Sequence, residues 1–138
     1  MLLELKRETP EFETFVAALR AAGLPTEDLH SEPFRYFSWN GVGFGGVGSG
    51  ADALLRSIVV PAPARGRGAG VALTEALARC AAEQGTQRLW LLTTGAAPFF
   101  EKLGWRPAAR PEAPASIAGS QQFSGLCPAS AALMVRPL

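Results

Sequence analysis

A glycine-rich stretch with two arginines is the part of the sequence best suited to chemistry. It reads Arg65-Gly66-Arg67-Gly68-Ala69-Gly70. Because glycine has no Cβ, the backbone here can approach a ligand closely and adopt angles that other residues avoid. The stretch opens a predicted helix, so unpaired amide hydrogens from about Arg67 to Val71 would gather at the positive end of that helix. Such an end, with arginine beside it, suits a phosphate or a diphosphate.

Two common phosphate-binding patterns do not describe this loop. The sequence has no GxxxxGK[ST], and the loop does not match GxGxxG with an acid about 20 residues later at a strand end. The simpler alternative to an anion site is a tight turn that uses glycine for packing and arginine for solubility. Both alternatives place the loop between a strand and a helix.

The elements on either side of the loop position it. Residues 53–60 are rich in β-branched side chains and predict a central strand, which Pro61 ends. Residues 88–94 form a nearly continuous apolar run, typical of a strand covered on both faces. Between them a helix to about Glu83 has one apolar face, formed by Val71, Leu73, Leu77 and Ala81. This order predicts that the two strands are parallel and lie next to, or near, each other in one sheet.

The N-terminal part predicts a strand, a helix and a hairpin. Leu3 and Leu5 alternate with charged neighbours, as in a half-buried first strand, and Thr9-Pro10 begins a helix to about Ala22. Thr26 is followed by acids and favours a short second helix. Asn40-Gly41 predicts a tight turn between strands 34–39 and 42–47.

The C-terminal part adds shorter elements. We expect a helix over residues 96–103 that ends at Gly104, and a strand that begins at Trp105. Residues 107–120 are rich in proline and alanine and predict a loop with a short helical turn. Residues 131–135 predict a last strand. The fold class is therefore α/β (α+β), with a central mixed sheet flanked by helices.

Composition limits the classes of function. The 138 residues suit a single domain, 1–138, and the content of 48% hydrophobic and 18% charged residues suits a globular protein. The net charge is +1 and the charges are scattered, which argues against a nucleic acid as partner. We expect no membrane span and no signal peptide, and hence a cytoplasmic location. The two cysteines, Cys80 and Cys127, form no metal or disulfide pattern.

Two motifs together resemble the GNAT acetyltransferases. In that family [RQ]-x-x-G-x-[GA] follows a strand and opens the helix that holds the diphosphate of coenzyme A, and residues 65–70 fit every fixed position. The family often continues with A-x-x-x-Y-E-K-x-G-[FY], and residues 96–105 read AAPFFEKLGW. The order of the elements is similar as well, so the resemblance covers nearly the whole chain.

The resemblance implies a fold, a cosubstrate and a site. The fold would be a GNAT-like sheet with a splayed acetyl-CoA cleft, and the activity would be acetyl transfer to an amine without a metal. The pantetheine arm would lie along Ile58-Val59-Val60, and Thr93 stands where the family places an asparagine that touches it. Family members are often homodimers. The implied coenzyme-binding residues are Ile58, Val59, Val60, Arg65, Gly66, Arg67, Gly68, Ala69, Gly70, Val71, Thr93 and Phe100.

The chain departs from the family in two places. Phe100 stands where many relatives have the tyrosine that protonates the departing sulfur. Strand 42–47, which often ends with a catalytic glutamate, has no acid before Asp52. The general base is therefore unassigned, and a noncatalytic acyl-CoA-binding or sensing module of the same fold is the alternative function.

Arg56 and Ser57 are the candidate catalytic residues. Arg56 lies in an otherwise apolar strand, where its charge needs a partner. It would bind a carboxylate of the substrate, or else face outward or form an internal ion pair. Ser57 would orient water or substrate, or else fill a local hydrogen bond.

A narrower resemblance is to the arsenic-resistance N-acetyltransferases. It rests on Leu54-Leu55-Arg56-Ser57, on Leu91-Leu92-Thr93-Thr94, and on Gln122-Phe123 followed by Leu126-Cys127-Pro128. It implies that the acceptor is the amine of a small molecule, such as an organoarsenical amino acid or another toxic amine.

Overall fold

The computed structural model describes residues 1–30 and 33–138 and folds them around one mixed β-sheet. Its order is β1-β2-β3-β4-β5-β7-β6, and the paired strands are antiparallel except for β4 and β5. The predicted α/β class with a mixed central sheet is confirmed. The strands described are β1 (Leu2–Glu4), β2 (Arg35–Trp39), β3 (Gly43–Val47), β4 (Asp52–Val59), β5 (Arg88–Thr93), β6 (Arg106–Ala108) and β7 (Ala132–Pro137).

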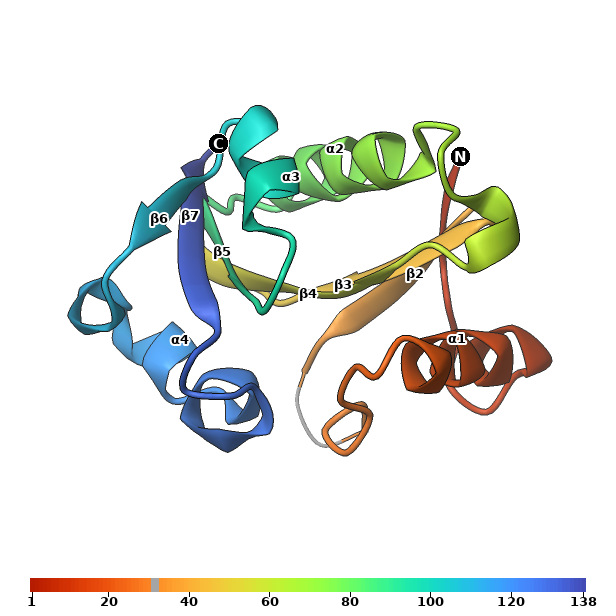
Figure 1. Cartoon of the computed structure of the whole chain (residues 1–138), viewed down its shortest axis with the longest axis horizontal. Coiled ribbons are helices and arrows are strands. Elements are labelled where there is room, and N and C mark those ends of the chain that lie inside the picture. Colours follow the sequence, from red (N-terminus) through yellow and green to blue (C-terminus); the bar gives the residue numbers. More distant parts are fainter. Residues whose placement is uncertain (31–32) are drawn as a thin grey trace.

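Helices cover both faces of the sheet (Figure 1). On one face lie α2 (Ala69–Glu83) and α3 (Ala97–Lys102), and on the other lie α1 (Pro10–Ala21) and α4 (Ala115–Ala118). Each face has its own apolar cluster. One gathers side chains of α1 and α4, and the other those of α2 and α3. The sheet is therefore buried on both faces, as the long apolar run of β5 predicts.

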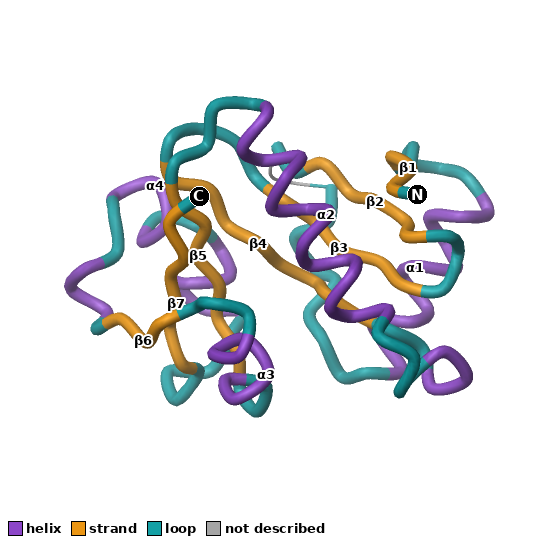
Figure 2. The backbone as a smooth tube through the Cα atoms, turned by 90° about the horizontal axis from the view of Figure 1, so that it is seen from above, coloured by secondary structure: helices purple, strands orange, loops and turns teal. Residues whose placement is uncertain are grey.

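The two central strands separate along their length. β4 and β5 are parallel neighbours, as predicted, but their pairing runs only from Asp52↔Arg88 to Leu54↔Trp90. β4 continues to Val59 and β5 to Thr93, and beyond the paired end the two strands diverge (Figure 2). Within residues 1–30 and 33–138, no strand therefore pairs with the backbone groups of β4 that face β5 past Leu54.

Local signals set the first helix and the hairpin. The hydroxyl of Thr9 accepts a hydrogen bond from the Phe12 N–H at 3.2 Å and caps α1, which begins at Pro10. Asn40 and Gly41 both have positive φ angles, 52° and 69°, as a tight turn between β2 and β3 requires. The predicted helix and hairpin are both confirmed.

Two N-terminal predictions are wrong in detail. Leu3 is 56% exposed, because β1 is an edge strand of the sheet. Residues 27–30 form a turn and not a helix. The reason is a tertiary contact, since Asp28 is buried and pairs with a charge on β4.

In the second half of the chain the elements lie close to their predicted bounds, but three details differ. Val71 is 41% exposed, although it was predicted on the buried face of α2. It stands in the first turn, ahead of the part of α2 that packs on the sheet. β7 runs two residues past its predicted end, to Pro137. Short helical turns at Ala62–Ala64, Arg110–Glu112 and Gln122–Leu126 complete the chain, and the last of these is a π-helical turn that the sequence did not predict.

Among the described helices, none has both the length and the apolar character that crossing a bilayer requires. Both cysteines are free thiols.

Candidate active site

A cleft of about 850 Å³ opens where β4 and β5 separate. β4 and the residues after it supply one wall, residues 54–60, and β5 with the following turn supplies another, residues 91–96. Residues 22–25 after α1 and residues 126–128 at the end of the π-helical turn line the cleft as well. The cleft therefore connects the two faces of the sheet through the gap between its central strands.

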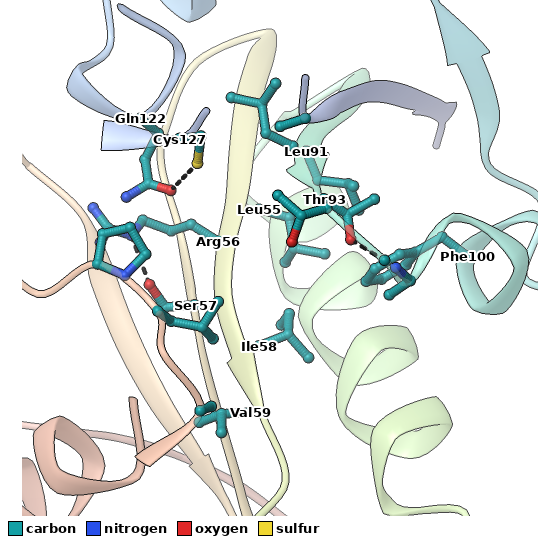
Figure 3. Close-up of a pocket in the computed structure, with 18 of the residues that line it drawn as sticks. Leu55, Arg56, Ser57, Ile58, Val59, Leu91, Thr93, Phe100, Gln122 and Cys127 are labelled. Atoms are coloured by element: carbon teal, nitrogen blue, oxygen red, sulfur yellow. Dashed lines mark hydrogen bonds between the residues drawn. The ribbon is translucent and has the colours of Figure 1, made fainter. Parts of the chain in front are cut away.

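At Ser57, the side chains of β4 stop alternating regularly between the two faces of the sheet. On β3, Phe44 and Gly46 are two residues apart, but their partners on β4, Val59 and Arg56, are three apart. This extra residue makes a β-bulge, and Ser57 takes a left-handed φ of 57° within it. As a result, Arg56 and Ser57 leave the same side of β4 (Figure 3).

The bulge divides the cleft into two sides. Ile58 packs with the α2 and α3 cluster, whereas Val59 belongs to the α1 and α4 cluster. In Figure 3, Ile58, Thr93 and Phe100 lie on one side of β4. After the roles that the resemblance implies for them, we call the side with Ile58 the coenzyme side, and the side with Arg56 and Ser57 the acceptor side.

The glycine-rich loop lies at the start of α2. Gly66 and Gly68 have φ angles of 81° and 77°, a left-handed conformation that suits glycine, and an added Cβ would meet open space at both. Gly68 is the N-cap, and α2 begins at Ala69. The first amides of α2 have no carbonyl partner within the helix and point out of its N-terminal end. The Arg65 Nε donates to the Val60 carbonyl at 2.8 Å and ties the loop to the end of β4.

The structure brings most of the candidate residues to one place. Arg67, Gly68 and Ala69 line a shallower hollow of about 370 Å³ on the same loop, and Gly66 and Val71 line neither cavity. The candidates that line the large cleft are Arg56, Ser57, Ile58, Val59, Val60, Arg65, Gly70, Thr93 and Phe100.

Two of these residues have defined local roles. Phe100 is buried and packs edge to face against Phe99 and Trp105, with ring centroids 5.1 and 5.8 Å apart. Thr93 accepts a hydrogen bond from the Ala96 N–H at 3.0 Å, which fixes the turn into α3. The Thr93 hydroxyl still has its own hydrogen to donate.

A buried polar network forms the acceptor side. Arg56 and Asp28 form a two-point ion pair, with Nη2 and Oδ1 2.7 Å apart and Nη1 bound to Oδ2. The Arg56 Nε donates to the Ser57 hydroxyl at 2.9 Å. The Gln122 side chain donates to Asp28 at 3.4 Å and accepts from the Cys127 thiol at 3.2 Å. Five side chains from three distant segments are thus joined in one chain of hydrogen bonds.

For Arg56 the structure shows one of the alternatives that the sequence left open. The Arg56 side chain is 1% exposed and that of Asp28 is 0% exposed, so the positive charge of Arg56 is neutralised in an internal ion pair. The pairing of Asp28 and Gln122 was not predicted, because they are separated from their partners by 28 and 94 residues. The charge of Arg56 within an apolar strand was the one signal that such a partner exists.

Titratable groups are few near the cleft. Burial raises the pKa of the Cys127 thiol, while the nearby Arg56 charge acts against this shift. Within residues 1–30 and 33–138, no carboxylate lines the cleft, and no cluster of three potential metal ligands occurs. Asp52 stands at the paired end of β4, where it binds Arg88 at 2.7 Å and the Trp90 indole at 2.9 Å.

Several solved structures, each with coenzyme A or acetyl-CoA bound, have folds similar to this one. N-acetylglutamate synthase from Neisseria gonorrhoeae, complexed with coenzyme A and N-acetyl-glutamate, gives a TM-score of 0.76 at 18% identity, over 100% of this chain and 35% of that one. This chain thus spans about a third of the synthase. Rv2747 from Mycobacterium tuberculosis, in complex with coenzyme A, gives 0.76 at 17% identity over 99% of both chains. A GNAT family acetyltransferase from Elizabethkingia anophelis, with acetyl-CoA bound, gives 0.70 at 14% identity over 100% of this chain and 97% of that one.

Sequence comparison extends the likeness beyond the fold. None of the curated proteins compared with the chain matches it. A family model described as an acetyltransferase (GNAT) domain matches residues 34–107, more than half of the chain. The matched segment contains the splayed strands, the bulge and the glycine-rich loop. The chain therefore belongs to the GNAT family of acetyltransferases.

Proposed function

We propose that this GNAT domain transfers an acetyl group from acetyl-CoA to the amine of a small molecule. One observation carries the proposal. The cleft between β4 and β5 joins a glycine-rich helix start on one side to a polar pocket on the other. An acyl donor and an amine can thus enter from opposite faces of the sheet and meet at the bulge.

The coenzyme side fits coenzyme A. The left-handed Gly66 and Gly68 let the backbone approach a diphosphate, and the free amides at the start of α2 can bind its oxygens. Arg65 lines the cleft and adds positive charge beside these amides. Past Leu54, the backbone of β4 offers unpaired groups that an extended pantetheine arm can bind as a further strand would.

The chain's own part in the reaction is mainly positioning. When bound, acetyl-CoA supplies an acetyl group activated as a thioester. A β4 amide near the bulge can stabilise negative charge that develops on the acetyl oxygen. Holding both reactants in one cleft replaces a bimolecular encounter with an oriented one. Phe100 lines the cleft, where its ring would pack against the coenzyme, and it has no hydroxyl from which to donate a proton.

The acceptor proposed first is an amino acid, including an organoarsenical amino acid. The specific arsenic acceptor is supported by the resemblance of residues 54–57, 91–94 and 122–128 alone. More general support comes from the gonococcal synthase, whose complex contains N-acetyl-glutamate, an acetylated amino acid. The alternative of an acyl-CoA sensor is favoured by Phe100 and by the lack of a carboxylate among the described residues of the cleft.

Release of free thiol from acetyl-CoA tests the proposed function. The purified protein is mixed with acetyl-CoA and a panel of amino acids, aminoglycosides, polyamines and arsenic-containing amino acids. We expect release with at least one amine and a loss of at least about 100-fold in Gly68→Glu, because a strained residue with a negative charge then faces the diphosphate. Coenzyme binding without release for any amine would favour the sensor.

Gly85→Glu is the matched control. Gly85 has a left-handed φ of 91°, has open space around its Cα, and lies just past the other end of α2. The two substitutions thus impose a similar strain on the same helix, but only Gly68 is at the coenzyme side. An equal loss in both variants would count against a coenzyme site at the loop.

A further inference from the structure

The bulge gives Ser57 an unusual position. A serine with a φ of 57° is strained, and such strain in a folded protein tends to occur at functional sites. Without the extra residue, Ser57 would point to the opposite side of β4 from Arg56. With it, the hydroxyl stands beside Arg56 and lines the cleft (Figure 3).

The side chain behind Ser57 is held firmly. Asp28 binds both terminal nitrogens of Arg56, and the guanidinium carbon lies 4.9 Å from the centre of the Phe34 ring. The third guanidinium nitrogen, Nε, donates its single hydrogen to the Ser57 oxygen at 2.9 Å. A buried ion pair contributes little net stability, because removing two charges from water costs about as much as their attraction returns. Its presence beside the cleft therefore suggests a role in the site.

This arrangement fixes how the Ser57 hydroxyl can be used. The oxygen accepts from a cation, so the single hydroxyl hydrogen points away from Arg56. A hydroxyl that accepts a charge-assisted bond becomes a stronger donor itself. Ser57 therefore presents a fixed donor, polarised by a positive charge, to whatever occupies the acceptor side.

We infer that Ser57 donates a hydrogen bond to a carboxylate or carbonyl oxygen near the amine of the acceptor. The substrate class is then amino acids and their amides, and not simple amines. Arg56 and Asp28 are positioning residues that act through Ser57. This inference rests on the proposed function and deepens it by naming the group that the site recognises.

Paired substrates test the inference. Thiol release is measured for the common amino acids and arsenic-containing amino acids, for their amides, and for the amines that lack the carboxyl group. We expect kcat/KM to be at least about 10-fold higher for the acid or the amide than for the matching amine, from one hydrogen bond to a charged or strongly polar group. Ser57→Ala should abolish this preference by lowering kcat/KM for the acid or amide, with little change for the amine.

Two further variants separate the hydroxyl from the backbone. Ser57→Gly also removes the hydroxyl but relieves the left-handed strain, so it should lose the preference as Ser57→Ala does. Arg56→Lys keeps a charge for Asp28 but has no Nε, and should reduce the preference while leaving the affinity for acetyl-CoA unchanged. Ser49→Ala, at an exposed serine between β3 and β4, should change nothing.

The outcomes distinguish this inference from the proposed function. Equal turnover of acids and matching amines, or an unchanged preference in both Ser57 variants, overturns the role of Ser57 and leaves the acetyltransferase intact. Turnover of simple amines alone also overturns the proposed role of Ser57. Silence with every amine, despite coenzyme binding, counts against the proposed function itself.

Discussion

The two sides of the cleft are built in opposite ways. The coenzyme side uses mostly backbone groups from a short segment, from Ile58 to Gly70, and needs glycine more than any particular charge. The acceptor side uses buried or half-buried side chains from three separate segments, namely Asp28, Arg56, Ser57, Gln122 and Cys127. A site made of backbone groups can bind the same acetyl donor in many different sequences. A site made of side chains can change the acceptor that it recognises when a single residue is substituted. Under the proposed function, this difference lets one fold keep its coenzyme while its acceptor changes.

The two sides should also respond differently to mutation. A backbone site depends on local geometry, so a change there should affect ligand binding more than folding. A buried charge network depends on every member having its partner, so a change there should affect folding as well. Variants on each side, measured for unfolding and for binding, probe this difference.

Removal of the charge of Asp28 should have the largest effect. Asp28→Asn leaves the Arg56 charge buried without its counter-charge, which costs about 3 kcal/mol of the free energy of unfolding. Denaturant unfolding measures it. Glu4→Gln is the matched control, since Glu4 pairs with Arg35 at 2.9 Å but both side chains are nearly half exposed. That variant should lose less than about 1 kcal/mol. Equal losses would mean that burial does not set the two ion pairs apart.

Loss of the loop arginines should have an intermediate effect, on binding alone. Arg65→Ala combined with Arg67→Ala should weaken the binding of acetyl-CoA about 10-fold, because charge is lost but the helix amides and glycines remain. Titration calorimetry gives the Kd, and the defect should shrink at high salt, where the charges are screened in any case. The free energy of unfolding should stay the same. An unchanged Kd would mean that the arginine side chains do not contribute and that only backbone groups bind the diphosphate.

The Cys127 thiol should have the smallest effect, seen only at alkaline pH. Burial raises its pKa in the folded chain, so above the ordinary pKa the unfolded chain releases the proton first. Stability should therefore fall as the pH rises through that range. In Cys127→Ala the loss between pH 8 and 10 should be smaller, by less than about 1 kcal/mol, because the thiol is half-buried. The same pH profile in both proteins would contradict this account.

The elements that were predicted well have local causes. Thr9 and Pro10 start α1, Asn40-Gly41 turns the hairpin, and the loop at residues 65–70 opens α2. In each case the residues that decide the structure are neighbours in the chain. The errors have distant causes: Leu3 is exposed because β1 is an edge strand, and Asp28 leaves its expected helix for a partner on β4.

The sequence by itself determined the strand, loop and helix that form the coenzyme side, because that side is made mostly of backbone and its glycines lie within one short stretch of the chain. It also placed Arg56 in an apolar strand. The charge of this residue indicated that it has a partner, but the sequence did not identify the partner. Only the tertiary structure decided the acceptor side. The bulge turns Ser57 to the face of Arg56, and folding brings Asp28 and Gln122 to that face from 28 and 94 residues apart. Contacts of such separation depend on how the whole sheet and its covering segments pack, and no local pattern encodes them.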